Sequence, residues 1–187
     1  CYPNRFRAEG GPLTGAYSSL QDWDGLVVYR WAADHGVKEI TGGFRTDPFG
    51  VNCDPLMLES DRIVALLFRR GDLLPGRNRY AIPIPDTIEA AVGTDYTRNQ
   101  RLLALVSQVG SVFASEWRGL PSADSPGAVT AVNALRNSGR AVSDTGEIEL
   151  DSRRLIFRVT APRALCLTLP GGSAQSGALE IGNADSF

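Results

Sequence analysis

Few side chains in this sequence combine the type and the setting that catalysis needs. Glu9 is the one carboxylate near the start of the chain that we weigh as a catalytic or ligand-binding residue. It lies close to two arginines, Arg5 and Arg7, so an ion pair with one of them is the structural alternative. Because exposed carboxylates near arginines commonly form such pairs, the sequence favours the ion pair over catalysis.

Two ring side chains at the end of a short apolar run are stronger candidates for binding. Trp31 follows residues 26–29, and His35 comes four residues later in a loop. The flat, apolar face of an indole can stack on the C–H face of a sugar, and an imidazole can hydrogen-bond to a hydroxyl. The alternatives are a tryptophan that caps a core and a structural or solvent-exposed histidine.

Metal and thiol chemistry find little support in the sequence. Cys1, Cys53 and Cys166 are odd in number and have no CxxC spacing, so they indicate neither a disulfide framework nor a zinc site. A single histidine argues against a His-rich metal site, and no cofactor is expected. The segment 143–146 is typical of a turn, because no histidine lies near to activate its serine.

Composition excludes several other classes of protein. The 187 residues carry a net charge of −2, which predicts no basic face for nucleic acid and no polybasic membrane anchor. No apolar run approaches the ~20 residues of a membrane span. The chain begins at Cys1 without an initiator Met or a signal-peptide pattern, so we expect an internal piece of a longer protein.

The local order of elements around Trp31 is predicted to be helix, strand, loop, helix. Residues 26–29 form an unbroken apolar run, which is typical of a strand buried on both faces. Apolar side chains at helical spacing predict a helix over residues 13–20, and Asp54-Pro55 followed by Gly71 predicts one over residues 54–70. Between them lies a long, Gly-rich loop at residues 32–53, of a length that is often functional.

The remaining sequence changes character twice. Residues 80–84 alternate with prolines and predict an edge strand, while apolar spacing across residues 100–117 predicts a helix. A short helix is expected near residues 128–135. From residue 143 onward the apolar period becomes two, which predicts antiparallel strands. We therefore expect three parts: residues 1–74, a connector over residues 75–142, and a β-rich, sandwich-like module over residues 143–187.

Four short segments also carry a family resemblance. Residues 2–9 and 21–25, read together, resemble the last two β/α units of large bacterial TIM-barrel glycoside hydrolases, of the clan that includes β-galactosidases and agarases. Residues 67–72 and 143–148 resemble segments that follow the barrel in this clan. The resemblance implies a fold that is α/β followed by mainly β: the incomplete end of a (β/α)8 barrel, a helical connector and part of an antiparallel β-sandwich.

The resemblance also implies a function and assigns residues to it. The parent enzyme would hydrolyse glycosidic bonds through paired glutamates that lie upstream of this chain. This piece would line one wall of the sugar site through Trp31, with His35 and Asn4 as further binding candidates and Glu9 as a substitute catalytic group. The family residue at the position of Trp31 is more often Tyr. The partners implied are a carbohydrate and the rest of the barrel, and the alternative function is a non-catalytic carbohydrate-binding or interaction module.

Overall fold

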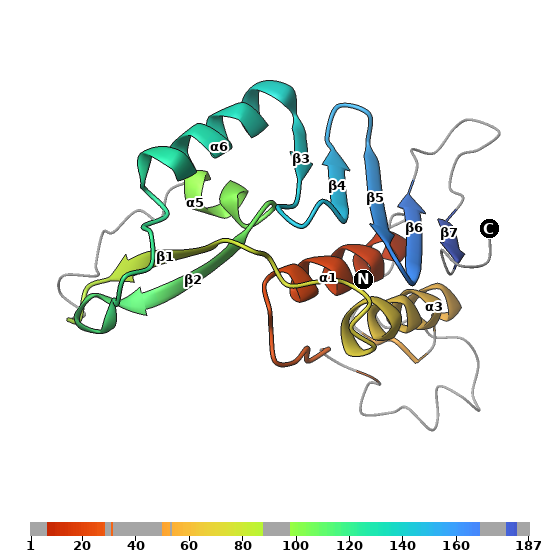
Figure 1. Cartoon of the computed structure of the whole chain (residues 1–187). Helices are drawn as coiled ribbons and strands as arrows, with labels where there is room; N and C mark the ends of the chain where they lie inside the picture. The colour runs from red at the N-terminus through yellow and green to blue at the C-terminus, as the bar shows by residue number, and fades with distance from the viewer. Residues whose placement is uncertain are drawn as a thin grey trace. The chain divides into compact units, whose positions relative to one another are not determined.

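The computed structural model describes residues 7–28, 31, 50–52, 54–87, 98–168 and 179–182, which form two compact units (Figure 1). Unit 1 comprises Cys1–Ser19 and Trp23–Asp72, and unit 2 comprises Leu20–Asp22 and Leu73–Phe187. Unit 2 holds both the expected connector and the expected β-rich module. Among the described residues, no helix is long and apolar enough to cross a membrane.

Unit 1 is built from helices whose ends follow local sequence signals. The short 3-10 turn η1 (Arg7–Glu9) leads into α1 (Gly10–Leu20), and α3 (Pro55–Val64) continues into the π-helical turn η2 (Ala65–Arg69). The side chain of Asp54 caps α3 by accepting a hydrogen bond from the Leu56 amide at 3.1 Å. Gly71, with φ of 71°, ends the helical run in the left-handed conformation that favours glycine. The predicted helix over residues 54–70 is thereby confirmed.

Small residues let α1 approach α3 and η2 closely. The Gly11 amide donates to the Ser60 hydroxyl at 2.8 Å, and that hydroxyl donates to the Ala8 carbonyl at 3.1 Å. One turn further on, Gly15 lies against Val64 and Leu67, where a Cβ would sit 3.1 Å from the Val64 Cα. The helices therefore meet through backbone and hydroxyl contacts, and buried Ala16, Ile63 and Leu67 are among the apolar residues of this unit's core.

The apolar run at residues 26–28 corrects a prediction. Leu26, Val27 and Val28 form no strand, and the side chains of Val27 and Val28 are 98% and 51% exposed. The prediction of a buried strand is wrong for these three residues, and Tyr29 lies outside the described residues. A strand needs a neighbouring strand to satisfy its N–H and C=O groups. The described part of unit 1 contains no other strand, so the run has nothing to pair with.

The first half of unit 2 is a parallel β-α-β arrangement. Strand β1 (Arg79–Ile84) pairs in parallel with β2 (Gln108–Phe113), and α5 (Arg98–Leu103) precedes β2. A single bridge joins Ala81 to Ser122 on the other side of β1. The turn η3 (Ala114–Glu116) follows β2, and α6 (Pro126–Ser138) comes next. Leu103, Ala123, Ala128 and Val132 form the buried cluster between helices and sheet.

The prediction of one helix over residues 100–117 is wrong. The chain is helical only to Leu103 and turns at residues 104–107 before it enters β2. The spacing of Leu102, Val106 and Val109 suits a helix, but β2 has a partner strand in β1 that sequence spacing cannot reveal. Pairing with β1 satisfies the backbone of a segment that holds Gly110 and two valines, and these residues are poor helix formers.

The second half of unit 2 is a five-stranded antiparallel meander. Its strands are β3 (Arg140–Val142), β4 (Ile148–Asp151), β5 (Ile156–Ala161), β6 (Ala164–Thr168) and β7 (Leu179–Gly182), and they lie side by side in chain order. The antiparallel strands expected from the period of two beyond residue 143 are present as β4 to β7, and β3 precedes them. Ile148, Val159 and Cys166 are buried on one face, whereas Arg140 and Arg158 on the other face are exposed.

The described residues contain two sheets but no barrel. Both the barrel origin of unit 1 and the sandwich origin of the meander therefore stay predictions.

Candidate functional site

The backbone of Trp31 is held beside the start of α3. Its carbonyl accepts hydrogen bonds from the Val51 amide at 3.1 Å and the Asn52 amide at 3.0 Å. The Val51 carbonyl in turn accepts from the Asp54 amide at 3.1 Å, which ties this short stretch to the helix cap. The Trp31 side chain is nevertheless 61% exposed. Unit 1 thus presents a large aromatic ring to solvent from an anchored position.

An apolar groove of about 180 Å³ lies in the same unit. Val51, which bonds to Trp31, is one of its lining residues, and residues 26–28, the start of α1 and the face of α3 supply the rest. Thr14, Ser60 and Asp61 are its polar side chains. Because Ser60 already bonds to both Gly11 and Ala8, Thr14 and Asp61 are the groups left to meet a polar ligand.

An ion pair between Arg7 and Asp54 joins η1 to the start of α3. The Arg7 guanidinium donates to both carboxylate oxygens of Asp54, with Nη2 at 3.2 Å from Oδ1, and both side chains are largely buried. The hydrogen bond from Arg7 is the main cause that lowers the pKa of Asp54, and the Leu56 and Met57 amides lower it further. Asp54 is therefore an ionised structural cap, and it cannot serve as a proton donor at neutral pH.

The candidate residues of the sequence fare differently. Glu9 lies in η1, half-buried, next to Gly10 of the groove. The Arg7 guanidinium pairs with Asp54, and no hydrogen bond or ion pair joins the side chain of Glu9 to another described residue. The Arg7 alternative for Glu9 is thus not seen, whereas Arg5, Asn4 and His35 lie outside the described residues. Unit 1 contributes Trp31 and Glu9 to the candidate site.

Sequence reasoning missed the groove itself. Thr14, Val51, Ser60 and Asp61 were not identified as lining residues, because they come from three separate segments of the chain that only packing brings together. The pair Gly10-Gly11 at the start of α1 was the one available signal, since adjacent glycines at a helix start indicate close backbone approach.

Other chemistry finds no support among the described residues. They contain no group of three His, Cys, Asp or Glu side chains that could hold a metal ion. Cys166 is fully buried on β6, and burial raises the pKa of its thiol to about 11. Because the thiolate is the nucleophilic form, this cysteine is inert at neutral pH.

The polar residues of the resemblance segments in unit 2 bind backbone groups. The Gln21 amide donates to the carbonyls of Ala104 and Ser107 at 2.9 and 2.7 Å, and its oxygen accepts from the Val109 amide at 2.9 Å. The Asp144 carboxylate accepts from the amides of Arg77 and Asn78 at 2.9 and 2.8 Å. Both side chains hold chain turns in place, which is a structural role.

Comparisons with protein-family models, with curated proteins and with solved structures found no match for this chain.

Proposed function

We propose that this chain is part of a TIM-barrel glycoside hydrolase and that unit 1 lines one wall of its sugar site. The observation that carries the proposal is the 61% exposure of Trp31, whose backbone carbonyl accepts hydrogen bonds from Asn52 and from Val51, a residue that lines the apolar groove. A large exposed aromatic ring contributes to the free energy of binding when a ligand covers its face and removes it from water. The resemblance of residues 2–9 and 21–25 to the barrel family supports the same function.

The groove supplies the chemistry that a sugar needs beside the ring. A pyranose presents apolar C–H faces and polar hydroxyl edges, so it suits an apolar surface with a few polar groups at its border. Trp31 would cover a face, while Thr14 and Asp61 would bond to hydroxyls. Because the Trp31 backbone is already anchored, little conformational entropy is lost when a sugar binds.

The exposed run at residues 26–28 counts against the barrel part of the proposal, because a barrel needs a buried strand at these residues. In a closed barrel these residues would pair with strands from other parts of the parent protein. Without such neighbours their apolar side chains stay uncovered, as Val27 and Val28 are. The proposal therefore requires that these residues are buried only in the complete barrel.

The catalytic carboxylates of this proposal lie upstream of the chain. Retaining hydrolysis takes a nucleophile and an acid/base about 5–5.5 Å apart. Asp54 is excluded because Arg7 and the helix cap use both of its oxygens. Glu9 stays the substitute candidate that the sequence offers. We expect no turnover of aryl glycosides by this chain, and turnover abolished by Glu9→Gln would show that Glu9 carries the chemistry.

A non-catalytic carbohydrate-binding or interaction module is the second candidate function. The observation that favours it is the antiparallel meander of unit 2, a β architecture that suits binding modules as well as enzymes. The coding sequence upstream of Cys1 distinguishes the two. An apolar strand followed by a glutamate there favours the enzyme, and a linker favours the module.

Affinity electrophoresis with neutral polysaccharides tests the sugar contact. The chain would be run through gels that contain β-linked galactan or β-linked glucan, beside Trp31→Ala and the control Trp23→Ala, whose ring is 54% exposed in the same unit. We expect a retarded wild type, an affinity loss of about tenfold for Trp31→Ala, and little change for Trp23→Ala. No retardation, or equal losses in both variants, would contradict the proposal.

A further inference from the structure

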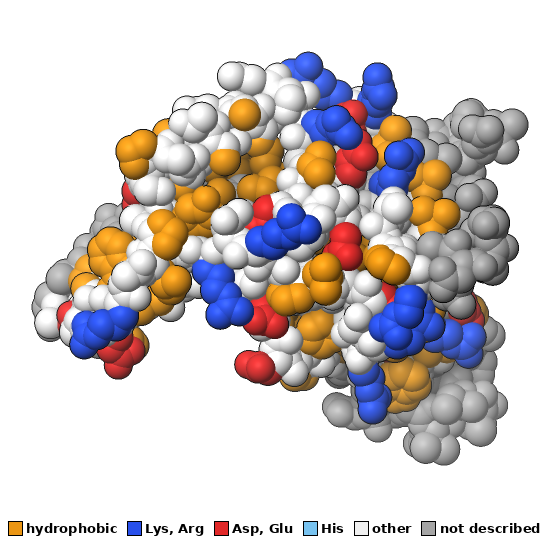
Figure 2. Space-filling view, viewed as in Figure 1, with side chains coloured by type: hydrophobic (Ala, Val, Ile, Leu, Met, Phe, Trp, Pro, Cys, Tyr) orange, Lys and Arg blue, Asp and Glu red, His pale blue; other side chains and the backbone are white. Residues whose placement is uncertain are grey.

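Arginines gather where α6 ends and the meander begins. Figure 2 shows blue side chains collected over the end of α6 and the first strands of the meander. Five exposed arginines make up this surface, which we call the arginine patch: Arg136, Arg140, Arg153, Arg154 and Arg158. Glu149 and Asp151 are the carboxylates that pair with it. Five guanidiniums against two carboxylates leave the patch strongly positive on a chain of net charge −2.

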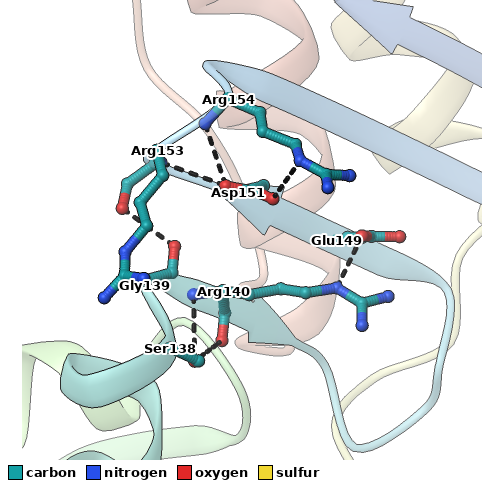
Figure 3. A network of polar contacts seen from close by, with 8 residues as sticks. Ser138, Gly139, Arg140, Glu149, Asp151, Arg153 and Arg154 are labelled. Carbon is teal, nitrogen blue, oxygen red and sulfur yellow. Dashed lines mark hydrogen bonds and ion pairs between the residues drawn. The ribbon is translucent and has the colours of Figure 1, made fainter.

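The contacts within the protein use only some of the N–H donors of each guanidinium. Arg140 Nε donates to Glu149 Oε1 at 2.7 Å, Arg154 Nε lies 3.8 Å from Asp151 Oδ2, and Arg153 Nη2 donates to the Asn137 carbonyl at 2.6 Å. Each guanidinium has five N–H donors, so most of them remain for another partner. In Figure 3 the terminal nitrogens of Arg140 and Arg154 point away from the carboxylates that hold their Nε atoms.

The turn that carries two of these arginines is held rigidly. Asp151 Oδ1 accepts from the amides of Arg153 and Arg154, both at 3.0 Å, and fixes the turn from β4 to β5. Ser152 joins this turn to the end of α6, because its amide and hydroxyl both donate to the Gly139 carbonyl, at 2.9 and 2.8 Å. The patch is therefore preorganised, and binding would cost little ordering of the backbone.

We propose that the arginine patch binds an acidic polysaccharide, a sugar polymer that carries carboxylate or sulfate groups along its length. The positive charges are spread over a helix end, two strands and a turn, so they match repeated anionic groups better than a single small anion. Guanidinium pairs with carboxylate or sulfate oxygens through parallel hydrogen bonds. Among the described residues, the patch includes no aromatic side chain on which nucleic-acid bases could stack and no Trp or Tyr anchor for a protein partner.

This inference does not depend on the sugar contact proposed for Trp31. The two surfaces belong to different units, carry different chemistry and are tested by different variants and different polymers. A failure to bind neutral polysaccharides would not count against the arginine patch. A failure to bind acidic polysaccharides would likewise not count against the sugar contact at Trp31.

Fluorescence anisotropy of the full chain with labelled heparin and labelled polygalacturonate tests the proposal. Neutral dextran, a single-stranded oligothymidine and poly-glutamate serve as comparison ligands. The patch variant is Arg154→Gln with Arg158→Gln, both exposed positions. The matched control removes two exposed arginines elsewhere, Arg62→Gln with Arg118→Gln. Circular dichroism checks that both variants fold.

We expect the chain to bind an acidic polysaccharide but not dextran, with affinity that falls between about 50 and 200 mM salt. The patch variant should weaken this binding by roughly tenfold and the control by less than about twofold. No binding at low salt, or equal losses in the two variants, would overturn the proposal. If oligothymidine or poly-glutamate binds more tightly than the acidic polysaccharides, the proposal is wrong and the ligand is a nucleic acid or an acidic peptide. If the patch variant does not fold, the salt dependence and ligand order of the wild type decide the question.

Discussion

Gln21 shows how one side chain can organise a turn that many residues share. Its amide nitrogen and oxygen make three hydrogen bonds to the backbone between α5 and β2, with Ala104, Ser107 and Val109. Each such bond contributes about 1 kcal/mol, and a buried group left without a partner costs about 1–3 kcal/mol. Gln21 lies in a segment that resembles a family motif, but its three hydrogen bonds give it a structural role. Resemblance by itself therefore does not mark a residue as catalytic.

Leu155 is the residue with the clearest unfavourable backbone conformation. It is the last residue of the β4–β5 turn, with φ of 55°, and it is 67% exposed. A left-handed conformation costs an L-residue roughly 1–2 kcal/mol, which glycine avoids. We predict that Leu155→Gly raises the free energy of unfolding by about 0.5–1 kcal/mol, because strain relief exceeds the added entropy of the unfolded chain. Denaturant unfolding followed by circular dichroism measures the change.

Leu74→Gly is the matched control for this prediction. Leu74 is also exposed, at 56%, but its φ is not positive. Glycine there relieves no strain and adds only unfolded-state entropy, so we expect a small loss of stability. A destabilised Leu155→Gly variant would show that the Leu155 side chain makes contacts that outweigh its backbone strain.

The contact between α1 and α3 depends on two adjacent glycines with opposite surroundings. A Cβ at Gly11 would lie 1.9 Å from the Ser60 carbonyl oxygen, whereas a Cβ at Gly10 would meet nothing within 4 Å. We predict that Gly11→Ala destabilises unit 1 by about 1–3 kcal/mol or more, because helix backbones must separate. Gly10→Ala should be neutral or stabilising by up to about 1 kcal/mol, since alanine favours the helix.

Thermal unfolding of the two alanine variants tests this pair directly. Both add one methyl group to the first turn of α1, so composition and helix propensity change alike. A similar melting temperature in the two variants would mean that α1 and α3 do not approach as closely as the Gly11–Ser60 hydrogen bond indicates.

Stability is expected to differ strongly along the chain. The meander strands are joined by continuous ladders from β3 to β7, whereas residues 25–28 have no regular structure and expose Val27 and Val28. Amides that open only with global unfolding exchange slowly, and amides without partners exchange almost at once. Hydrogen exchange with mass spectrometry should therefore show strong protection in β4 and β5 and none at residues 26–28. Strong protection at residues 26–28 would restore the buried strand that the sequence indicated.

The sequence by itself determined those features that need only neighbouring residues. Asp54-Pro55 and Gly71 mark the ends of a helical run because a cap and a left-handed stop act on the adjacent backbone. The period of two beyond residue 147 predicted strands because alternate side chains face opposite sides of a sheet. At the candidate site, the same kind of reasoning identified Trp31 and Glu9, but it did not identify the groove residues Thr14, Ser60 and Asp61.

Only the tertiary structure decided which segments found partners. Among the described residues, the apolar run at residues 26–28 has no strand beside it, and Val27 and Val28 stay exposed, while β2, whose spacing suited a helix, pairs with β1. Arg7 bonds to Asp54, 47 positions along the chain, rather than to nearby Glu9. The physical reason is the same in each case: backbone and charged groups are satisfied by whatever folding brings within hydrogen-bond distance, and sequence spacing does not record that distance.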